Sequence, residues 1–151
     1  MPRSTSSGFK LAGCARQVLG SRAARCVAYL GLCAAYLQGG LVKLTDFPAA
    51  LGEMSHFGLA PAPLFAVLVI ALELGASAMI LAGRLRWLAA FGLAGFTLMA
   101  TFIALRFWEM PAGQERFMAA NSFFEHLGLV GGFLLVAWLD LQEDGAKPQS
   151  R

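Results

Sequence analysis

The stretch PAPLFAVLVIALELGASAMILAG, residues 61–83, decides the fold class. It opens with two prolines, closes on a glycine and carries a single charged residue, Glu73. A helix rises about 1.5 Å per residue, so roughly 20 residues cross the hydrocarbon core of a bilayer, which is about 30 Å thick. The stretch therefore predicts a helix that crosses a membrane.

Three further apolar stretches of similar length surround it, at residues 26–42, 87–105 and 117–139. The sequence is 58% hydrophobic and only 14% charged, a composition that exceeds what the core of a soluble domain needs. Short connections make consecutive helices antiparallel neighbours. We predict an all-α membrane protein, a bundle of four transmembrane helices over residues 22–141. A cytoplasmic tail (1–21) precedes it and a disordered cytoplasmic tail (142–151) follows it.

Lysine and arginine set the orientation, because cytoplasmic loops are enriched in both. With the N-terminus inside, nine of the twelve lie on the cytoplasmic side, and only Lys43, Arg106 and Arg116 lie outside. The prediction is a multi-pass protein of a bacterial inner membrane with both termini in the cytoplasm. The basic residues form no patch interleaved with aromatic residues, so the expected partner is the lipid bilayer and not nucleic acid.

The connection between the first two predicted spans contains a helix signal. Asp46 can cap a helix whose first turn holds Pro48, and Gly58 can end it. Apolar side chains between them recur with a helical period. We expect a short interfacial helix in this outer loop.

Charged residues inside the predicted spans are the best candidates for function. Placing a charged side chain near the middle of a bilayer costs about 2.5–3.5 kcal/mol of free energy, so such a residue needs a reason to be there. Glu73 lies mid-span, and Glu125 with His126 lie about two turns inside the fourth span. Such residues normally face protein or a cavity. Two interpretations of Glu73 remain open, a functional carboxyl and a packing residue that orders the helices.

Helical spacing groups the polar residues by face. The stripes are Tyr36, Gly40 and Lys43; Glu73 and Ser77; Thr97 and Thr101; and Ser122, Glu125, Leu129 and Gly132. Gly128 and Gly132 also form GxxxG, which favours close helix approach. If the stripes converge, they enclose an outward-open pocket. Counting depth along each helix, we expect Glu125 near Lys43 or Arg106, and Glu73 beneath them, too deep for Lys43 to reach unaided.

Resident redox groups are not expected. Cys14, Cys26 and Cys33 include no CxxC pair and are expected to be small buried residues. The only histidines are His56 and His126, which argues against a bis-histidine haem, and the sequence has no iron–sulfur or zinc spacing. We predict no metal site and no intrinsic cofactor.

Four segments, taken in order, resemble the DoxX family. They are QGGLVKLT (38–45), MSHFGLAP (54–61), LELG with ILAG (72–75 and 80–83) and NSFFEHLGLVGGFLL (121–135). They correspond to a G-x-x-K-L opening, a G-x-P segment, an E-L-x-G core and a glycine-glycine fourth helix, and the likeness extends over about residues 22–141. Lys43 and Glu73 match this pattern, whereas many relatives carry Lys-Asn in place of Glu125 and His126.

The resemblance implies a small four-helix inner-membrane protein, in a family where some members take part in sulfur-compound or thiol oxidation coupled to quinone. The first hypothesis is therefore the membrane subunit of a quinone-linked oxidoreductase, with a bound quinone or a partner's cofactor as the electron carrier. The candidate catalytic residues are Glu73, Glu125 and His126, and the candidate pocket residues are Tyr36, Lys43, Thr101 and Arg106. Tyr36, Glu73 and His126 are the candidate proton donors to quinone.

Two other roles stay open at this point. One is a non-catalytic scaffold that anchors a partner enzyme or assembles as a homo-oligomer through its GxxxG face. The other is a small-solute permease, since carboxylates within membranes often mark such paths.

Overall fold

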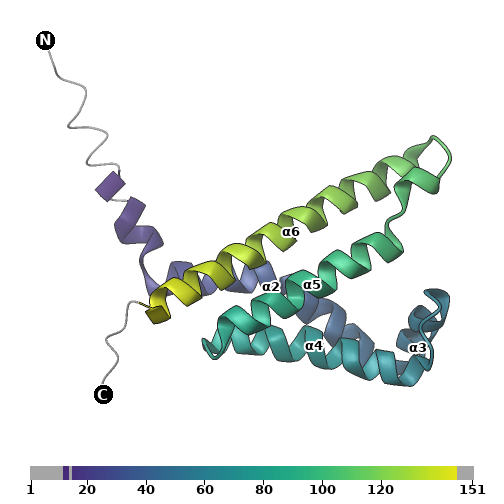
Figure 1. Cartoon of the computed structure of the whole chain (residues 1–151), viewed down its shortest axis with the longest axis horizontal. Coiled ribbons are helices and arrows are strands. Elements are labelled where there is room, and N and C mark those ends of the chain that lie inside the picture. Colours follow the sequence, from purple (N-terminus) through teal and green to yellow (C-terminus); the bar gives the residue numbers. More distant parts are fainter. Residues whose placement is uncertain (1–11, 14, 146–151) are drawn as a thin grey trace, which may run out of the picture. The chain divides into compact units, whose positions relative to one another are not determined.

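The computed structural model of the chain describes residues 12, 13 and 15–145, and no strand occurs among them. Figure 1 shows the helices α2 (Arg22–Thr45), α3 (Phe47–His56), α4 (Ala62–Ala82), α5 (Arg86–Ala104) and α6 (Gln114–Gly145), with a 3₁₀ turn η1 (Phe107–Glu109) after α5. In this part of the chain α2, α4, α5 with η1, and α6 are long and apolar enough to cross a membrane. The four predicted spans are thus present. Three are longer than expected, whereas α4, with 21 residues, is slightly shorter than the predicted stretch 61–83.

The chain divides into two compact units, Met1–Gly31 and Leu32–Arg151. In the first unit, helical residues 15–19 lead to a turn, and Ser21 caps α2 by accepting a hydrogen bond of 3.1 Å from the Ala24 N–H. Part of the predicted tail is therefore helical, and residues 1–11 and 14 lie outside the described residues. In the second unit α6 continues through residues 142–145, where we expected disorder to begin; residues 146–151 lie outside the described part.

A helix is present in the loop between α2 and α4, where the sequence predicted one. Asp46 accepts a hydrogen bond of 3.1 Å from the Ala49 N–H, and proline occupies the first turn of α3. Ala50 and Met54 of α3 pack with Ala66 of α4 in a cluster whose members are at most 3% exposed. These contacts hold α3 against α4. Its place at the membrane surface stays a prediction, as does the orientation of the chain.

A residue of α6 contacts the start of α5, just after the turn that joins α4 to α5. Gly83 ends α4 in the left-handed conformation, with φ of 71°, which suits a residue without Cβ. Asp140 of α6 accepts a 3.0 Å hydrogen bond from the Trp87 N–H, so its carboxylate caps the start of α5. The same carboxylate lies 3.4 Å from Arg86, whose Nε donates to the Ile80 carbonyl oxygen at 3.0 Å.

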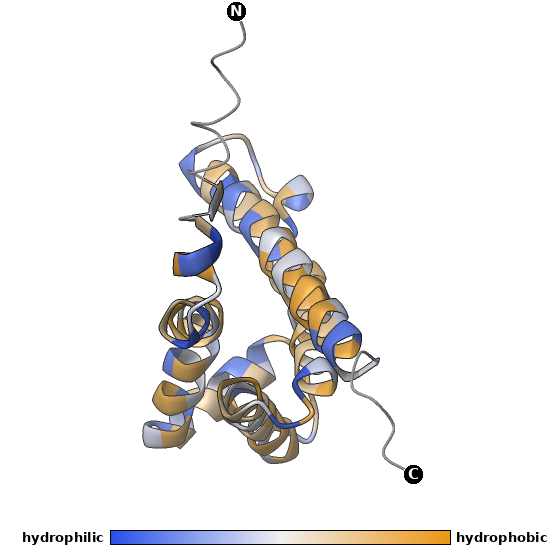
Figure 2. Ribbon diagram, turned by 90° about the vertical axis from the view of Figure 1, so that its left-hand side faces the viewer, coloured by the Kyte–Doolittle hydropathy of each residue, from blue (hydrophilic) through white to orange (hydrophobic). Residues whose placement is uncertain are grey.

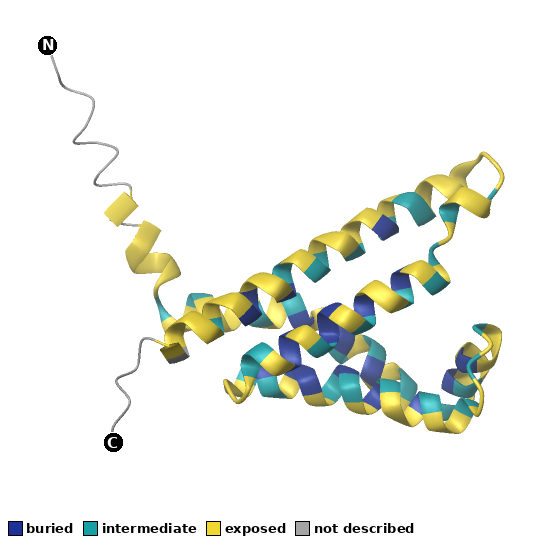
Figure 3. Cartoon of the chain, viewed as in Figure 1, coloured by how far each residue is buried: buried dark blue, intermediate teal, exposed yellow. Residues whose placement is uncertain are grey.

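The second unit buries four polar side chains along with its apolar core and leaves many large apolar side chains exposed. Helix α5 packs against both α4 and α6, and the faces buried between helices include Glu73, Ser77, Thr97 and Thr101, none more than 6% exposed. Large apolar side chains such as Phe91, Leu98 and Leu135 are exposed instead. Figures 2 and 3 show hydrophobic residues along the long helices and the buried positions on α4 and α5. A bilayer is the solvent that favours this arrangement.

Candidate functional site in the helix bundle

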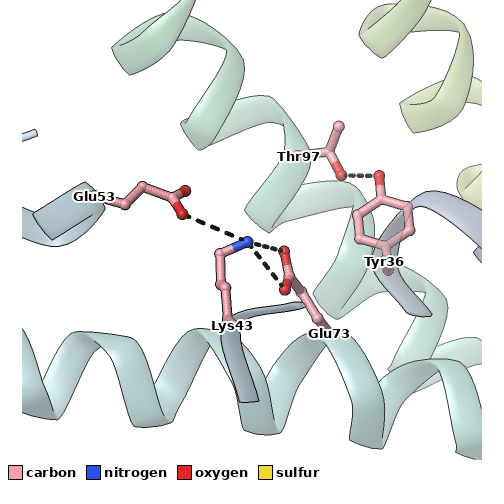
Figure 4. Close-up of polar contacts among 5 residues, drawn as sticks. All are labelled: Tyr36, Lys43, Glu53, Glu73 and Thr97. Atoms are coloured by element: carbon pink, nitrogen blue, oxygen red, sulfur yellow. Dashed lines mark hydrogen bonds and ion pairs between the residues drawn. The ribbon is translucent and has the colours of Figure 1, made fainter. Parts of the chain in front are cut away.

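A buried ion pair joins α2 to the middle of α4 (Figure 4). The Lys43 Nζ lies 3.4 Å from both carboxylate oxygens of Glu73, and the two side chains are 14% and 8% exposed. Glu53 of α3 lies on the other side of the ammonium, with its Oε2 at 3.8 Å and its side chain 44% exposed. One cation therefore lies between two carboxylates, one buried and one accessible.

Two adjacent glycines make room for this pair. A Cβ at Gly40 would lie 2.8 Å from two side-chain carbons of Leu74, so the absent side chain allows α2 to approach α4. A Cβ at Gly39 would lie 3.5 Å from the Lys43 Nζ and 3.6 Å from both oxygens of Glu73. The double glycine thus leaves space for the helix contact and keeps a methyl group away from the charges.

A second polar contact joins α2 to α5. Figure 4 shows the Tyr36 hydroxyl pointing at the Thr97 hydroxyl, and the two oxygens are 2.5 Å apart. Thr97 donates to the Leu93 carbonyl oxygen at 2.6 Å. The Tyr36 ring stands edge-on to Phe133 of α6, with centroids 5.3 Å apart. Tyr36 is only 6% exposed, and its hydroxyl is held in one place by these neighbours.

A third contact joins α5 to α6. The Thr101 hydroxyl lies 2.9 Å from Nδ1 of His126, and it donates to the Thr97 carbonyl oxygen at 2.6 Å. Thr101 is completely buried. His126 is half-buried.

These groups surround a cavity of about 550 Å³ between α2, α3, α4, α5 and α6. Its volume falls within the range of about 300–1,000 Å³ that small-molecule sites occupy. The polar residues on its wall are Tyr36, Lys43, Glu53, Glu73, Thr97 and His126. Apolar and aromatic side chains make most of the remaining lining, among them Phe65, Leu72, Phe96 and Met99. A cavity of this kind suits a mainly apolar ligand with a few polar atoms.

In a comparison with known families, the DoxX model matches residues 25–106, more than half of the chain. The chain belongs to the DoxX family. Together with the four candidate transmembrane helices, this makes it a multi-pass membrane protein. Searches of curated proteins and of solved structures gave no match. All five residues drawn in Figure 4 fall inside the matched segment of this DoxX protein, and His126 lies beyond it.

Most of the predicted site residues come together in the DoxX protein. Tyr36, Lys43, Glu73 and His126 line the cavity, and Thr101 lies directly behind His126 as its hydrogen-bond partner. The predicted stripes explain this convergence, because the members of each stripe on α4 and α5 are buried together. The roles assigned to these residues are taken up below as a proposal.

Glu125 and Arg106 do not take the expected positions. Glu125 is exposed on α6 and is not part of the cavity wall. Arg106 is also exposed and pairs with Glu109, its Nη1 lying 3.3 Å from a carboxylate oxygen. The burial of Phe123 and Phe133 turns the His126 side of α6 inward. Since neighbouring residues point about 100° apart around a helix, Glu125 then faces outward.

The predicted depth of Glu73 relative to Lys43 was also wrong. We expected Glu73 to lie too deep for Lys43, yet the two side chains are in direct contact. The residue count along each helix gives the height of a Cα atom, whereas the Cα–Cβ bonds of a helix tilt toward its N-terminus. The long Lys43 side chain therefore extends back along α2 into the bundle and meets Glu73.

Sequence reasoning did not identify Glu53 and Thr97 as site residues. Thr97 had a signal, because it shares a helical face with Thr101. Glu53 had a weaker one, because α3 begins only two residues after α2 ends and therefore brings its acidic residue near Lys43.

The cysteines differ in their environments. Cys33 is buried, as expected, but Cys26 is exposed, and Cys14 lies outside the described residues. Among the described residues, no three His, Cys, Asp or Glu side chains gather as a metal site would require.

Proposed function

We propose that this DoxX protein is the quinone-binding membrane subunit of an oxidoreductase in a bacterial cytoplasmic membrane. The observation that supports the proposal is a largely apolar cavity with a buried ion pair on its wall. A quinone has the matching chemistry, an apolar ring and tail with two polar oxygens. When bound, a quinone supplies two-electron, two-proton redox chemistry, and in this proposal the second redox group belongs to a partner subunit.

The charged residues on the wall would hold the polar edge of the ring. Lys43 offers positive charge to an oxygen atom, and Glu73 can carry a proton to or from the same region. Burial decreases from Glu73, at 8% exposed, through Lys43, at 14%, to Glu53, at 44%. This graded series connects the cavity with the surface through ionisable groups, which suits proton transfer.

The apolar side chains of the lining would contact the ring and exclude water from it. Contact with aromatic and aliphatic side chains supplies most of the binding free energy of such ligands, and a few polar groups set their orientation. Residues suited to this contact extend from α4 to α5, namely Phe65, Leu72, Phe96 and Met99.

Filling the cavity tests the proposal. Ala100 lines the cavity, so Ala100→Phe should occupy the space of the ring. Ala71 is exposed on α4 and outside the cavity wall, so Ala71→Phe is the matched control. After purification with native lipids, mass spectrometry should find quinone bound to the unmodified protein and to the control, and little in Ala100→Phe. Absence of enriched quinone from the unmodified protein would overturn the proposal.

One observation favours the anchor role as a second candidate. Glu125 is exposed on α6, in a helix apolar enough to span a membrane, where contact with lipid would cost about 2.5–3.5 kcal/mol. A transmembrane helix of the partner subunit with Lys or Arg at this depth would remove that cost. A photo-crosslinking residue at Gly128, which is exposed one turn after Glu125 and leaves its carboxylate intact, should then link to a basic transmembrane peptide. One at Leu98, on the exposed face of α5, should not.

A further inference from the structure

The directions of the hydrogen bonds on α5 follow from counting protons. The Thr97 and Thr101 hydroxyls each lie 2.6 Å from the carbonyl oxygen one turn earlier, those of Leu93 and Thr97 respectively. A carbonyl oxygen can only accept, and a threonine hydroxyl has a single hydrogen to donate. Each threonine therefore gives its hydrogen to the backbone and has only lone pairs left for its second partner.

Those second partners must then be the donors. The Tyr36 O–H donates to Thr97, and Nδ1–H of His126 donates to Thr101. A neutral imidazole with hydrogen on Nδ1 has a bare lone pair on Nε2. Among the described residues Nε2 has no hydrogen-bond partner, and the cavity wall includes both His126 and Tyr36. This wall therefore presents acceptors, the Tyr36 oxygen and Nε2, and no spare donor of its own.

The geometry points to a site that selects the hydroxyl-bearing, reduced form of its ligand, a hydroquinone, over the quinone. A hydroquinone O–H can donate to Nε2 of His126 or to the Tyr36 oxygen, whereas a quinone carbonyl can only accept and would meet lone pairs there. The inference rests on the proposed function and names the redox state that the cavity fits. It reverses the role expected from the sequence, where Tyr36 and His126 were candidate proton donors.

The charged residues of the cavity wall, Lys43, Glu53 and Glu73, do not offset the preference for the hydroquinone. The Lys43 ammonium contacts the carboxylates of Glu73 and Glu53, so its hydrogens already face acceptors. His126 and Tyr36 would contact the ligand directly. Thr97 and Thr101 are positioning residues, because they act only by orienting the hydrogens of these two side chains.

The histidine tautomer is measurable without any ligand. The full chain, labelled with ¹⁵N-histidine and placed in lipid nanodiscs, contains two histidines, and His56→Gln leaves only the signal of His126. The ¹⁵N shifts of unmodified His126 should report hydrogen on Nδ1. Thr101→Val should lose this bias because its methyl group cannot accept, and Thr101→Ser should restore it. Hydrogen on Nε2 in the protein with intact Thr101 would overturn the inference, even if the valine variant failed to fold.

Binding of three probes separates this inference from the proposed function. They are a short-chain benzoquinol, the matching benzoquinone and the dimethyl ether of the quinol, titrated without oxygen. One additional hydrogen bond should make the quinol bind roughly three- to tenfold more tightly than the other two. His126→Phe should abolish most of the difference. Equal binding of all three probes would overturn the inference and leave the proposed function intact, whereas no binding of any probe would overturn both.

Discussion

Two ion pairs of similar burial join the helices of the second unit, and their surroundings differ. Lys43–Glu73 and Arg86–Asp140 both have a nitrogen–oxygen distance of 3.4 Å, and all four side chains are at most 17% exposed. Asp140 also accepts from the backbone of α5, and Arg86 also donates to the backbone of α4. Lys43 and Glu73 instead line the cavity, with Glu53 as their charged neighbour.

The difference shows how to distinguish a structural ion pair from one available to a ligand. A buried charge is costly unless its remaining hydrogen-bonding capacity is used. In Arg86–Asp140 helix ends use that capacity, so the pair stabilises the α4–α5 turn and its contact with α6. Lys43 contacts both Glu73 and Glu53, and within the described part of the chain neither member of the Lys43–Glu73 pair bonds to a helix end. Both line the cavity.

The first prediction concerns the side of the membrane on which each pair lies, and its effect is all-or-none. If both termini are cytoplasmic, Lys43–Glu73 lies toward the periplasm and Arg86–Asp140 toward the cytoplasm. Alkaline phosphatase, which is active only in the periplasm, should be active when inserted near Gly113 and inactive when fused after Arg151. The reverse pattern would place Lys43–Glu73 toward the cytoplasm and Arg86–Asp140 toward the periplasm.

The largest graded effect is expected at Asp140. Asp140→Ala removes the cap of α5 and leaves Arg86 without its carboxylate, so the free energy of unfolding should fall by about 3 kcal/mol. Circular dichroism during thermal unfolding in detergent measures the change. Glu115→Ala, which removes an exposed carboxylate from the first turn of the same helix, should change the free energy by less than about 1 kcal/mol. Equal free energies of unfolding for the two variants would show that Asp140 does not stabilise the fold.

At Glu73 the effect should appear in ligand binding more than in stability. Glu73→Gln preserves the shape of the side chain but abolishes its charge and proton exchange, so quinone affinity should fall roughly tenfold, the equivalent of about 1.4 kcal/mol. Glu73→Leu should lose binding as well. If Glu73 only orders the helices, the leucine variant will bind quinone normally, and that result would return the residue to a packing role.

A smaller effect is expected where α2 meets α4. A Cβ at Gly40 would overlap the Leu74 side chain, so Gly40→Ala should lower the free energy of unfolding by about 1 kcal/mol. Gly75 is the matched control, because nothing lies within 4 Å of a Cβ added there. Gly75→Ala should raise stability slightly, since alanine favours helix. Similar values for both variants in thermal unfolding would argue against close packing at Gly40.

The sequence predicted which segments form helices and which residues share a helix face. Hydropathy and length identified four spans, and the residues that helical spacing grouped on one face, Tyr36 with Gly40 and Thr97 with Thr101, are buried. These properties are local, so they can be read within one helix.

The features that the sequence did not predict correctly depend on contacts between helices. Periodicity did not reveal that α6 turns His126 inward and Glu125 outward, because both positions fit a polar stripe and only packing of Phe123 and Phe133 chooses between them. It also gave no sign that Asp140, 53 residues along the chain, would cap Trp87. A cap usually comes from the residue just before its helix.

In the proposed function a quinone ring occupies the cavity beside Lys43 and Glu73. Photolabelling with a short-chain azidoquinone in lipid nanodiscs, followed by peptide mass spectrometry, tests it most directly. We expect labels on cavity residues from different helices, such as Leu72, Phe96 and Met99, and their loss when excess unlabelled quinone competes. Labels confined to outward-facing residues such as Phe91 and Leu135, unaffected by competition, would contradict it.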